Sequence, residues 1–334
     1  MSLPILPLID TFGRRHNNLR LSVTDRCNIR CFYCMPAEQV KFLPRHEILT
    51  FEEIERLVQA FAHVGVDKLR LTGGEPLVRS DIDQLVHRLK SIPQIREVAM
   101  TTNAVNLAKQ AERLKHAGLD RLNISLDALD RDTLVAITRR DVLDQVLAGI
   151  AAAQDVGFKR IRLNAVAIKG LTEAEVLPLA RFALERDLEL RFIEYMPLDS
   201  DQTWSNEKVL SGETIRELIE QEFGPLVPAQ RTDPSQPAFD YRYAEGRGRL
   251  GLIHPVTAPF CDTCNRLRLT AEGKLRNCLF SLEEWDLRAL LRQGASEQEI
   301  LALVRACVLA KQPGHLIGQK HFERPVRTMH QIGG

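Results

Sequence analysis

The 334-residue sequence has almost no net charge, because 45 lysine and arginine residues offset 44 aspartate and glutamate residues and leave a formal charge of +1 at pH 7. A protein dedicated to nucleic acid needs a large basic excess for its phosphate contacts. The near balance therefore argues against a nucleic-acid polymer as the partner.

Long apolar runs are missing as well. No stretch approaches the roughly 20 residues that cross a bilayer, and the first apolar segment, residues 3–9, is too short and too rich in proline for the core of a secretory signal. We therefore expect no membrane contact and a cytoplasmic location. The 44% hydrophobic and 27% charged residues are typical of a globular protein, and the length suggests about two domains.

The sequence has few cysteines, and their number is odd. The seven form two tight groups and one isolated residue, Cys307. In a compartment that keeps thiols reduced, this distribution favours ligands of a metal or cluster over a disulfide framework. Cys307 lies in an apolar helical run, so we expect it to be a buried structural thiol.

Short β-rich runs alternate with helical segments in the first two thirds of the chain. Repeated βα units of this kind imply parallel strands with right-handed crossovers, and hence an α/β sheet or an incomplete barrel. Thr50 and Glu53 form a plausible capping box for the first helical segment. The six predicted strands are Leu19 to Thr24, Asp67 to Thr72, Glu97 to Thr101, Arg121 to Leu126, Arg160 to Ile168 and Leu188 to Tyr195.

Side chains of equal parity along these strands form polar faces. A packed barrel interior would consist of branched apolar residues, so polar inward faces favour a wider barrel that holds a polar ligand. The alternative, that these faces are simply solvated, carries equal weight for any single strand. The polar sets are Arg20, Ser22 and Thr24; Lys68, Arg70 and Thr72; Asn123, Ser125 and Asp127; Arg160, Arg162 and Asn164; and Glu194 with Met196.

Beyond Pro197 the pattern changes to loops around a short helix, strand-like pieces near Tyr241 and Leu250, a hairpin and a helix from Ser296 to Leu309. We place a first domain at residues 1–210 and a smaller α+β domain at residues 211–334.

The first cysteine group is Cys27, Cys31 and Cys34, directly after the first predicted strand. Three thiolates can hold three irons of a [4Fe-4S] cube and leave the fourth iron open to a substrate. Zinc, completed by His16 or His46, is the weaker alternative because it prefers four ligands, usually in C-x2-C pairs.

The second group is Cys261, Cys264 and Cys278. If residues 271–273 form a hairpin turn, Thr270 lies opposite Lys274 and Cys278 returns to the neighbourhood of Cys264. A period of two then places two arginines on one face beside the cysteines, a setting suited to phosphate. Taken alone, this group is equally consistent with a zinc ribbon completed by His254. The two arginines are Arg266 and Arg268.

The first cysteine motif, followed after the second strand by residues 73–76 (Gly-Gly-Glu-Pro), resembles the radical S-adenosylmethionine (SAM) superfamily. Glycines allow close backbone approach to a ligand, and carbonyls or a carboxylate can accept from its ammonium group. With residues 19–28, the second cysteine hairpin and the terminal Gly333-Gly334, the chain resembles the GTP 3′,8-cyclase family from about Asp10 onward.

This resemblance implies an incomplete (β/α)6 radical SAM barrel with a smaller C-terminal domain that carries a second cluster. In that family the first [4Fe-4S] cluster reduces SAM to methionine and a 5′-deoxyadenosyl radical, which abstracts hydrogen from the ribose C3′ of GTP. The carbon radical attacks C8 and gives (8S)-3′,8-cyclo-7,8-dihydroguanosine 5′-triphosphate, in the first step of molybdenum cofactor biosynthesis. The cofactor carries this chemistry, while the protein positions the reactants and excludes water.

The resemblance also implies roles for individual residues. It assigns the first cluster to Cys27, Cys31 and Cys34, and the second cluster, which holds the base, to Cys261, Cys264 and Cys278. It assigns SAM contacts to Tyr33, Gly74, Ser125 and Met196. It assigns GTP contacts to Arg20, Arg70, Thr101, Arg162, Arg266 and Arg268, and catalytic roles to Arg20 and to the tail residues Gly333 and Gly334.

Arg162 stands where the family pattern usually has lysine, so a bidentate fork replaces a point charge and the phosphate geometry there is open. The alternative for Arg162, Arg70 and Lys68 is an ion pair across the lumen, and the role of Lys68 stays undecided. His315, His321 and His330 show no ligand-like spacing, so we assign them no metal. Trp204 and Trp285 are expected to be packing groups.

The family further implies a reductant protein, hand-over of the product to the cyclic pyranopterin monophosphate synthase, and a homodimer. Two other functions remain open. One is a radical SAM maturase that uses an auxiliary cluster on a peptide substrate. The other is an electron-transfer or zinc-stabilised binding protein, which leaves residues 73–76 and the polar strand faces without explanation.

Overall fold

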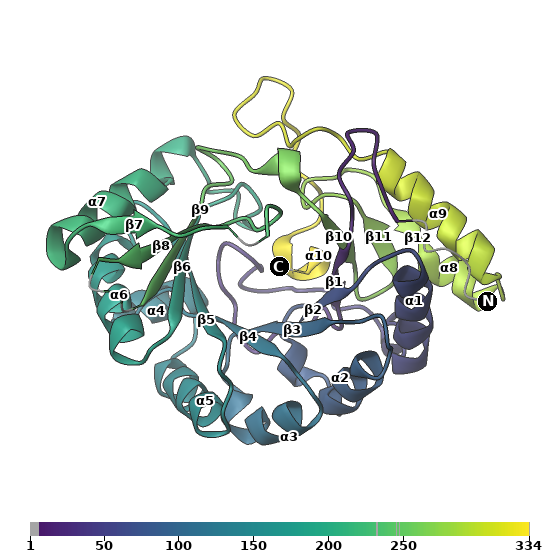
Figure 1. The fold of residues 1–334 in the computed structure, drawn as a ribbon, viewed down its shortest axis with the longest axis horizontal. Helices are drawn as coiled ribbons and strands as arrows, with labels where there is room; N and C mark the ends of the chain where they lie inside the picture. The colour runs from purple at the N-terminus through teal and green to yellow at the C-terminus, as the bar shows by residue number, and fades with distance from the viewer. Residues whose placement is uncertain (1–6, 232, 245, 247, 334) are drawn as a thin grey trace.

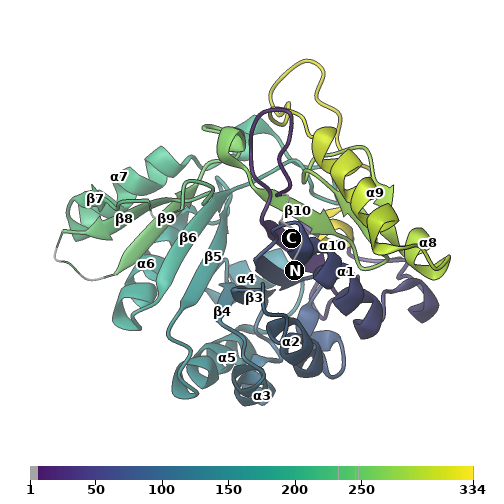
Figure 2. The same cartoon turned by 45° about the vertical axis from the view of Figure 1, so that its right-hand side comes forward.

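The computed structural model describes residues 7–231, 233–244, 246 and 248–333. Its centre is a curved, twelve-stranded sheet in the order β12-β11-β10-β1-β2-β3-β4-β5-β6-β9-β8-β7, with helices along its outer face (Figure 1). The strands β1 to β6 pair in parallel. They are Asn18–Ser22, Lys68–Thr72, Glu97–Thr102, Arg121–Ser125, Ile161–Ala167 and Glu189–Glu194. The arc of the sheet stays open on one side, as expected for an incomplete barrel (Figure 2).

The six predicted strands are all present, with ends that differ by at most two residues. The largest difference is at the end of β1, which stops at Ser22 rather than at Thr24. There the carbonyl of Thr24 accepts from the amide of Gly74 at 2.7 Å, because the chain turns away from the ladder toward the first cysteine group. The shortened strand therefore brings the loop after β1 against the loop after β2.

The helices between the strands bury one apolar face against the sheet. The predicted capping box of α1 is confirmed, since the Thr50 side chain and the Glu53 side chain each bond the other residue's backbone amide. Helices α1 to α6 are Phe51–His63, Ile82–Lys90, Ala111–His116, Arg131–Thr138, Leu143–Asp155 and Val176–Glu185.

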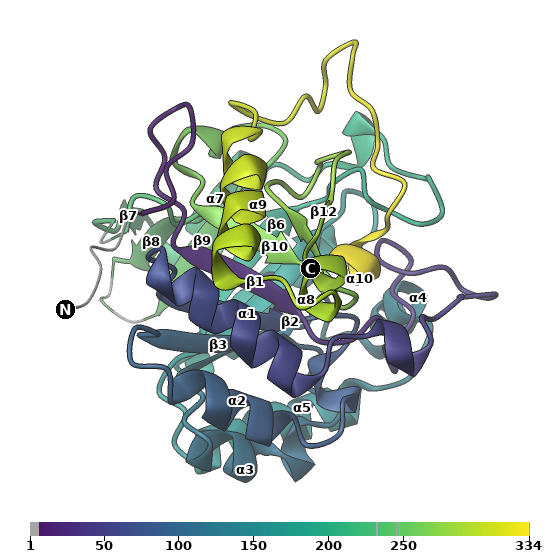
Figure 3. The same ribbon diagram turned by 90° about the vertical axis from the view of Figure 1, so that its right-hand side faces the viewer.

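The C-terminal part of the chain extends both edges of this sheet. Strand β10 pairs in parallel with β1 at one edge, and β9 pairs in parallel with β6 at the other. Helix α9 lies beside α1 (Figure 3), where Glu297 Oε1 is 2.8 Å from His63 Nδ1. The strands β7 to β12 are Leu226–Pro228, Phe239–Tyr243, Arg249–Ile253, Arg266–Leu269, Lys274–Arg276 and Trp285–Asp286; the helices α7 to α10 are Gly212–Phe223, Leu287–Arg292, Glu297–Leu309 and Met329–Ile332.

The hairpin in the second cysteine group has the predicted register. Arg268 lies opposite Arg276 and Leu269 opposite Leu275. The amide of Thr270 donates to the carbonyl of Lys274 at 2.9 Å, so these two residues face each other across the turn. Cys307 is buried, as expected for a structural thiol. Trp204 is half-buried, and its indole Nε1 donates to a backbone carbonyl.

His16, a possible zinc ligand in the sequence, is buried in an internal network. Its Nε2 lies 3.0 Å from Asp10 Oδ2, which also accepts from Arg14 Nε at 2.6 Å. Burial lowers the pKa of His16 from 6.5 to about 4, although Asp10 opposes the shift. The folded protein therefore holds this imidazole in its neutral form.

This neutral imidazole predicts a pH dependence of stability. Because the pKa of His16 is lower in the folded than in the unfolded state, the neutral imidazole contributes stability that is complete above pH 6.5. This contribution is lost as the pH falls toward 4. We expect the free energy of unfolding to be roughly 2 kcal/mol lower at pH 5 than at pH 7 through this residue. The free energy of unfolding of His16→Gln, measured in urea, should vary less between pH 7 and pH 5 than that of the unchanged protein. An equal pH dependence in the two proteins would contradict this role. The pKa of Asp10 is itself lowered from 3.8, so its contribution changes only below this window.

Candidate active site

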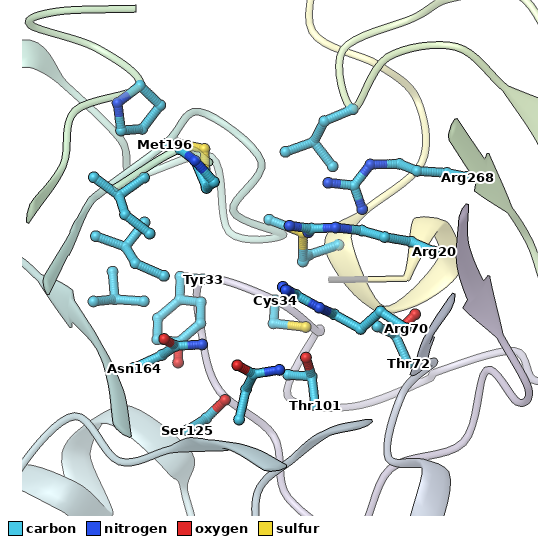
Figure 4. Close-up of a pocket in the computed structure, with 18 of the residues that line it drawn as sticks. Arg20, Tyr33, Cys34, Arg70, Thr72, Thr101, Ser125, Asn164, Met196 and Arg268 are labelled. Carbon is cyan, nitrogen blue, oxygen red and sulfur yellow. The ribbon is translucent and has the colours of Figure 1, made fainter. Parts of the chain in front are cut away.

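A cavity of about 300 Å³ lies inside the arc of the sheet, and all six grouped cysteines line it. The residues in Figure 4 reach this cavity from opposite sides of the barrel, with arginines on one side and polar groups of β3, β4 and β5 on the other. The two cysteine groups therefore share one chamber although more than two hundred residues separate them in sequence. The cysteines are Cys27, Cys31, Cys34, Cys261, Cys264 and Cys278.

The first cysteine group is held by a tight turn. The amides of Cys34 and Met35 both donate to the carbonyl of Cys31 at 2.9 Å, and the loop is tied to α4 through the amides of Arg30 and Phe32. Burial raises the pKa of Cys27 to about 11 and also raises the pKa of Cys31 and of Cys34. Three half-buried thiols facing one chamber are a donor set that fits an iron–sulfur cluster, whose positive irons offset the cost of ionising them.

The second cysteine group has a different electrostatic setting. Cys261 begins a short 3₁₀ helix, and its carbonyl accepts from Arg14 at 2.9 Å. The guanidinium of Arg266 donates to Cys264 Sγ through Nε at 3.4 Å and Nη2 at 3.3 Å. Burial alone would raise the pKa of Cys264, but Arg266 and Lys311 bring it down to about 5. The donor set also fits a cluster, here next to cations. Within the described ranges, no three Cys, His, Asp or Glu side chains are arranged to hold a single metal ion.

The glycines of residues 73–76 allow the chain to approach its own backbone. Gly73 has a φ of +153°, and a Cβ on Gly74 would lie 2.2 Å from the carbonyl oxygen of Arg26. The amide of Glu75 donates to that same oxygen at 2.7 Å. The two glycines therefore lock the loop after β2 against the segment that leads into Cys27. Gly74 still lines the cavity, as its predicted contact with SAM requires.

The carboxylate of Glu75 is used internally. It accepts from the amide of Leu77 at 3.0 Å, the hydroxyl of Thr102 at 2.6 Å and the amide of Asn103 at 2.7 Å. Burial raises its pKa to about 7 against the effect of these donors. An ammonium group bound by this carboxylate, as the sequence suggested, would therefore compete with three internal donors.

Four arginines line one side of the cavity. The Nε atoms of Arg20 and Arg70 are buried and have no hydrogen-bond partner among the described residues. Burial, followed by repulsion from neighbouring arginines, lowers the pKa of both, and burial lowers the pKa of Arg268 to about 9. In Figure 4 the side chains of Arg20, Arg70 and Arg268 point toward the same central space. Buried guanidiniums that repel each other are suited to binding a polyanion. The fourth is Arg266.

The remaining predicted contacts divide into two sets. Tyr33, Ser125, Met196 and Thr101 line the cavity, and the hydroxyl of Tyr33 donates to Asp127 at 2.6 Å.

Arg162 and Lys68 do not line this cavity in the described structure; each forms an ion pair, at 2.7 Å with Glu189 and at 2.5 Å with Asp233. Both residues are therefore ion-paired, but Arg162 pairs with its neighbour on the adjacent strand β6 rather than across the lumen, and a contact of Arg162 with GTP stays a prediction.

Arg191 also lines the cavity and was missed by the sequence analysis. The register pairs Arg191 with Asn164, and Arg191 and Ile193 line the cavity; the predicted residues Glu194 and Met196 line it as well, at the carboxyl end of the strand. The carboxylate of Glu194 accepts from the amides of Val256 and Thr257 at 2.9 Å. Alternation of polar residues at 189 and 191 with apolar ones at 188, 190 and 192 is the signal that could have identified this face.

The C-terminal tail enters the barrel (Figure 1). The carbonyl of Gly333 accepts from Arg268, and a Cβ on Gly333 would lie 2.7 Å from Thr72 Oγ1. His330 Nδ1 is 3.1 Å from the carbonyl oxygen of Cys34, so α10 also contacts the first cysteine loop. The tail therefore lies between the arginines and β2 without room for a side chain. Gly334 lies outside the described residues.

Comparisons with known proteins agree with this arrangement. A model of the radical SAM superfamily matches residues 21–183, and a model named Molybdenum Cofactor Synthesis C matches residues 188–317. Among solved structures, SuiB of Streptococcus suis bound to S-adenosylmethionine aligns with a TM-score of 0.59 at 17% identity, over 84% of this chain and 67% of its own. Methylornithine synthase aligns with a TM-score of 0.54 at 15% identity, over 87% and 86%. These structures share the fold of this chain, and the radical SAM assignment comes from the family model over residues 21–183.

Curated relatives are more similar in sequence. A GTP 3′,8-cyclase of Rhodopirellula baltica is 50% identical over 98% of this chain and 92% of its own length. A GTP 3′,8-cyclase of Pelotomaculum thermopropionicum is 45% identical over 97% and 99%, and one of Mycolicibacterium smegmatis is 44% identical over 98% and 92%. With matches of this extent, two cysteine groups in one chamber and a tail inserted beside its arginines, the chain belongs to the GTP 3′,8-cyclase family.

Proposed function

We propose that this protein is a radical SAM enzyme that converts GTP to (8S)-3′,8-cyclo-7,8-dihydroguanosine 5′-triphosphate, the first step of molybdenum cofactor biosynthesis. The observation that carries the proposal is one cavity lined by two cysteine triplets and five arginines. A chamber of this kind can bring a redox-active centre and a highly charged nucleotide together. Full-length identity of 44 to 50% to GTP 3′,8-cyclases supports this substrate.

Two [4Fe-4S] clusters fit the two donor sets, the first held by Cys27, Cys31 and Cys34 and the second by Cys261, Cys264 and Cys278. When bound, the first cluster would supply, with SAM, the radical chemistry of hydrogen abstraction, and the second would offer an open iron position for the guanine base. The protein provides binding, orientation and exclusion of water.

The cavity residues divide this task between the two substrates. Gly74, Ser125 and Met196 lie near the carboxyl ends of β2, β4 and β6, where barrel enzymes form their sites, and contact SAM together with Tyr33. The free guanidinium nitrogens of Arg20 and Arg70 bind the triphosphate, aided by Arg266, Arg268 and Thr101. Arg162 reaches the triphosphate only if it leaves Glu189.

The proposal extends to the partners, the oligomeric state and the location of the enzyme. The first cluster needs a reductant protein, and the product is handed to the cyclic pyranopterin monophosphate synthase. We place the enzyme in the cytoplasm as a homodimer without a nucleic-acid polymer or a membrane as partner. In the part of the chain that the structure describes, no helix has both the length and the apolarity to span a bilayer.

The test is anaerobic incubation of the reduced, cluster-loaded protein with SAM and GTP, followed by mass analysis. We expect equimolar 5′-deoxyadenosine and a product with the mass of GTP but a different retention time. Deoxyadenosine formed while GTP is recovered unchanged would contradict the proposed substrate and leave radical SAM chemistry in place. Such a result would favour the maturase with a peptide substrate.

Deletion of Gly333 and Gly334 should suppress turnover by roughly 100-fold, because a small misplacement of reacting groups has an effect of this size. The carbonyl of Gly333 accepts from Arg268, so its loss frees a guanidinium inside the site. Iron content and SAM binding should stay at the level of the unchanged protein. A truncated protein with an unaffected rate would assign the tail no catalytic role.

A further inference from the structure

Lys311 is a buried cation next to the second cysteine group. It follows α9, and only 4% of its surface is exposed. Its Nζ donates to Cys264 Sγ at 3.5 Å and to the carbonyl oxygen of Arg266 at 2.9 Å. The ammonium group therefore lies between the cysteine loop and the start of β10.

No aspartate or glutamate in the described residues forms an ion pair with Lys311. The other paired lysines in that part of the chain, Lys68, Lys90 and Lys274, each contact an aspartate. Arg14 and Arg266 add further positive charge around Lys311, whereas the thiols of Cys264 and Cys278 are the groups that favour its charged form. A buried ammonium needs a counter-charge, so its partner is the sulfur.

The two cysteine groups differ in this respect. Cys264 Sγ receives N–H groups from two cations, Arg266 and Lys311. At the first group the side-chain donor to Cys27 Sγ is the neutral amide of Asn103 at 3.7 Å; Glu75 disfavours the thiolate of Cys27, while two backbone amides and the charge of Arg30 favour it. Asp127 likewise disfavours the thiolate of Cys31.

The two donor sets are therefore electrostatically unequal. Hydrogen bonds to the ligand sulfurs and the local charge are the main protein terms that set the potential of an iron–sulfur cluster. A cation at a ligand sulfur favours the more negatively charged, reduced state of the cluster and raises its potential.

We propose that Lys311 is a positioning residue for the second cluster, whose ammonium group supplies the counter-charge of the Cys264 thiolate and raises the reduction potential of that cluster. This inference rests on the proposed second cluster. It adds a residue outside the cysteine hairpin, on the segment between α9 and the tail, whose charge distinguishes the second cluster from the first.

The experiment isolates the second cluster in the full chain by replacing Cys27, Cys31 and Cys34 with serine. In this background, Lys311→Met removes the charge and keeps the length of the side chain, whereas Lys311→Arg keeps the charge. Lys115→Met on α3 is the matched control, because the exposed Lys115 donates to the Gly157 carbonyl and lies over the Phe158 ring, away from both cysteine groups. Each variant is reconstituted anaerobically, assayed for iron and sulfide, and titrated electrochemically with detection by electron paramagnetic resonance.

We expect the midpoint potential of Lys311→Met to shift to more negative values, with Lys311→Arg and Lys115→Met close to the parent. Loss of iron from Lys311→Met but not from Lys311→Arg would also support a role for the charge at position 311 in holding the second cluster. An unchanged potential in iron-loaded Lys311→Met, or equal effects of Met and Arg, would overturn the inference. If Lys311→Met is insoluble, Lys311→Gln takes its place with the same expectation.

A parent variant that binds no iron at all gives a separate result. It would remove the proposed second cluster, and the inference with it, while the first cluster and SAM cleavage could still be measured in the unchanged chain. If only the inference fails, the parent variant binds iron, and its reduction potential does not change with the charge at position 311.

Discussion

Cys34→Ser should form no detectable 5′-deoxyadenosine from SAM under reducing conditions. Cys34 lies in the tight turn with Cys31, and it lines the same cavity as the proposed SAM contact Met196. A serine oxygen is a poor ligand for iron that thiolates bind well, so the first cluster loses one of three attachments. The same loss is expected for Cys27→Ser and Cys31→Ser.

Cys307→Ala is the matched control for this experiment, because Cys307 is buried in the core without lining the cavity. It should lose some stability but retain SAM cleavage once loaded with iron. Persistent deoxyadenosine formation by Cys34→Ser would refute the assignment of the first cluster. The absorbance and iron content of each variant separate a missing cluster from a cluster that is present but inactive.

Arg20→Met should weaken GTP binding by roughly 10- to 100-fold while SAM binding stays unchanged, since a hydrogen bond to a charged group contributes roughly 1.5 to 3 kcal/mol. The Nε of Arg20 is buried without a partner in the described structure, and repulsion from Arg268 disfavours its charge. An anionic triphosphate resolves both conditions. Equilibrium binding of GTP and of SAM measures the two affinities separately.

The thermal stability of the ligand-free protein distinguishes a binding role from a structural one. Removing one of several buried, mutually repelling guanidiniums should not lower it, and GTP should raise the midpoint of the unchanged protein more than that of Arg20→Met. Arg181→Met is a suitable control, because Arg181 is exposed and pairs with Glu222 outside the barrel. Equal losses of GTP and SAM affinity in Arg20→Met would contradict the assignment.

The sequence predicted those features that depend on local pattern. The six parallel strands followed from alternating β-rich and helical segments, and the register of Thr270 with Lys274 followed from a three-residue turn. The inner positions of Arg20 and Arg70 followed from the period of two in the strands, whereas Thr101 was named only through the family resemblance.

Features that depend on distant contacts could not be predicted in this way. The pairing of β10 with β1 and of β9 with β6 joins segments that lack any shared local signal. The ion pairs of Arg162 and Lys68 depend on which carboxylates the folded chain places opposite them. The approach of Lys311 to Cys264 depends on where α9 ends.

Placement of GTP inside the chamber, between the two cysteine groups, is the central claim. GTP deuterated at the ribose C3′ tests it most directly, because the cavity must bring this carbon within reach of the radical formed from SAM. We predict that the deuterium appears in 5′-deoxyadenosine and disappears from the cyclised nucleotide. Unlabelled 5′-deoxyadenosine formed together with a nucleotide product that retains the deuterium would contradict the account.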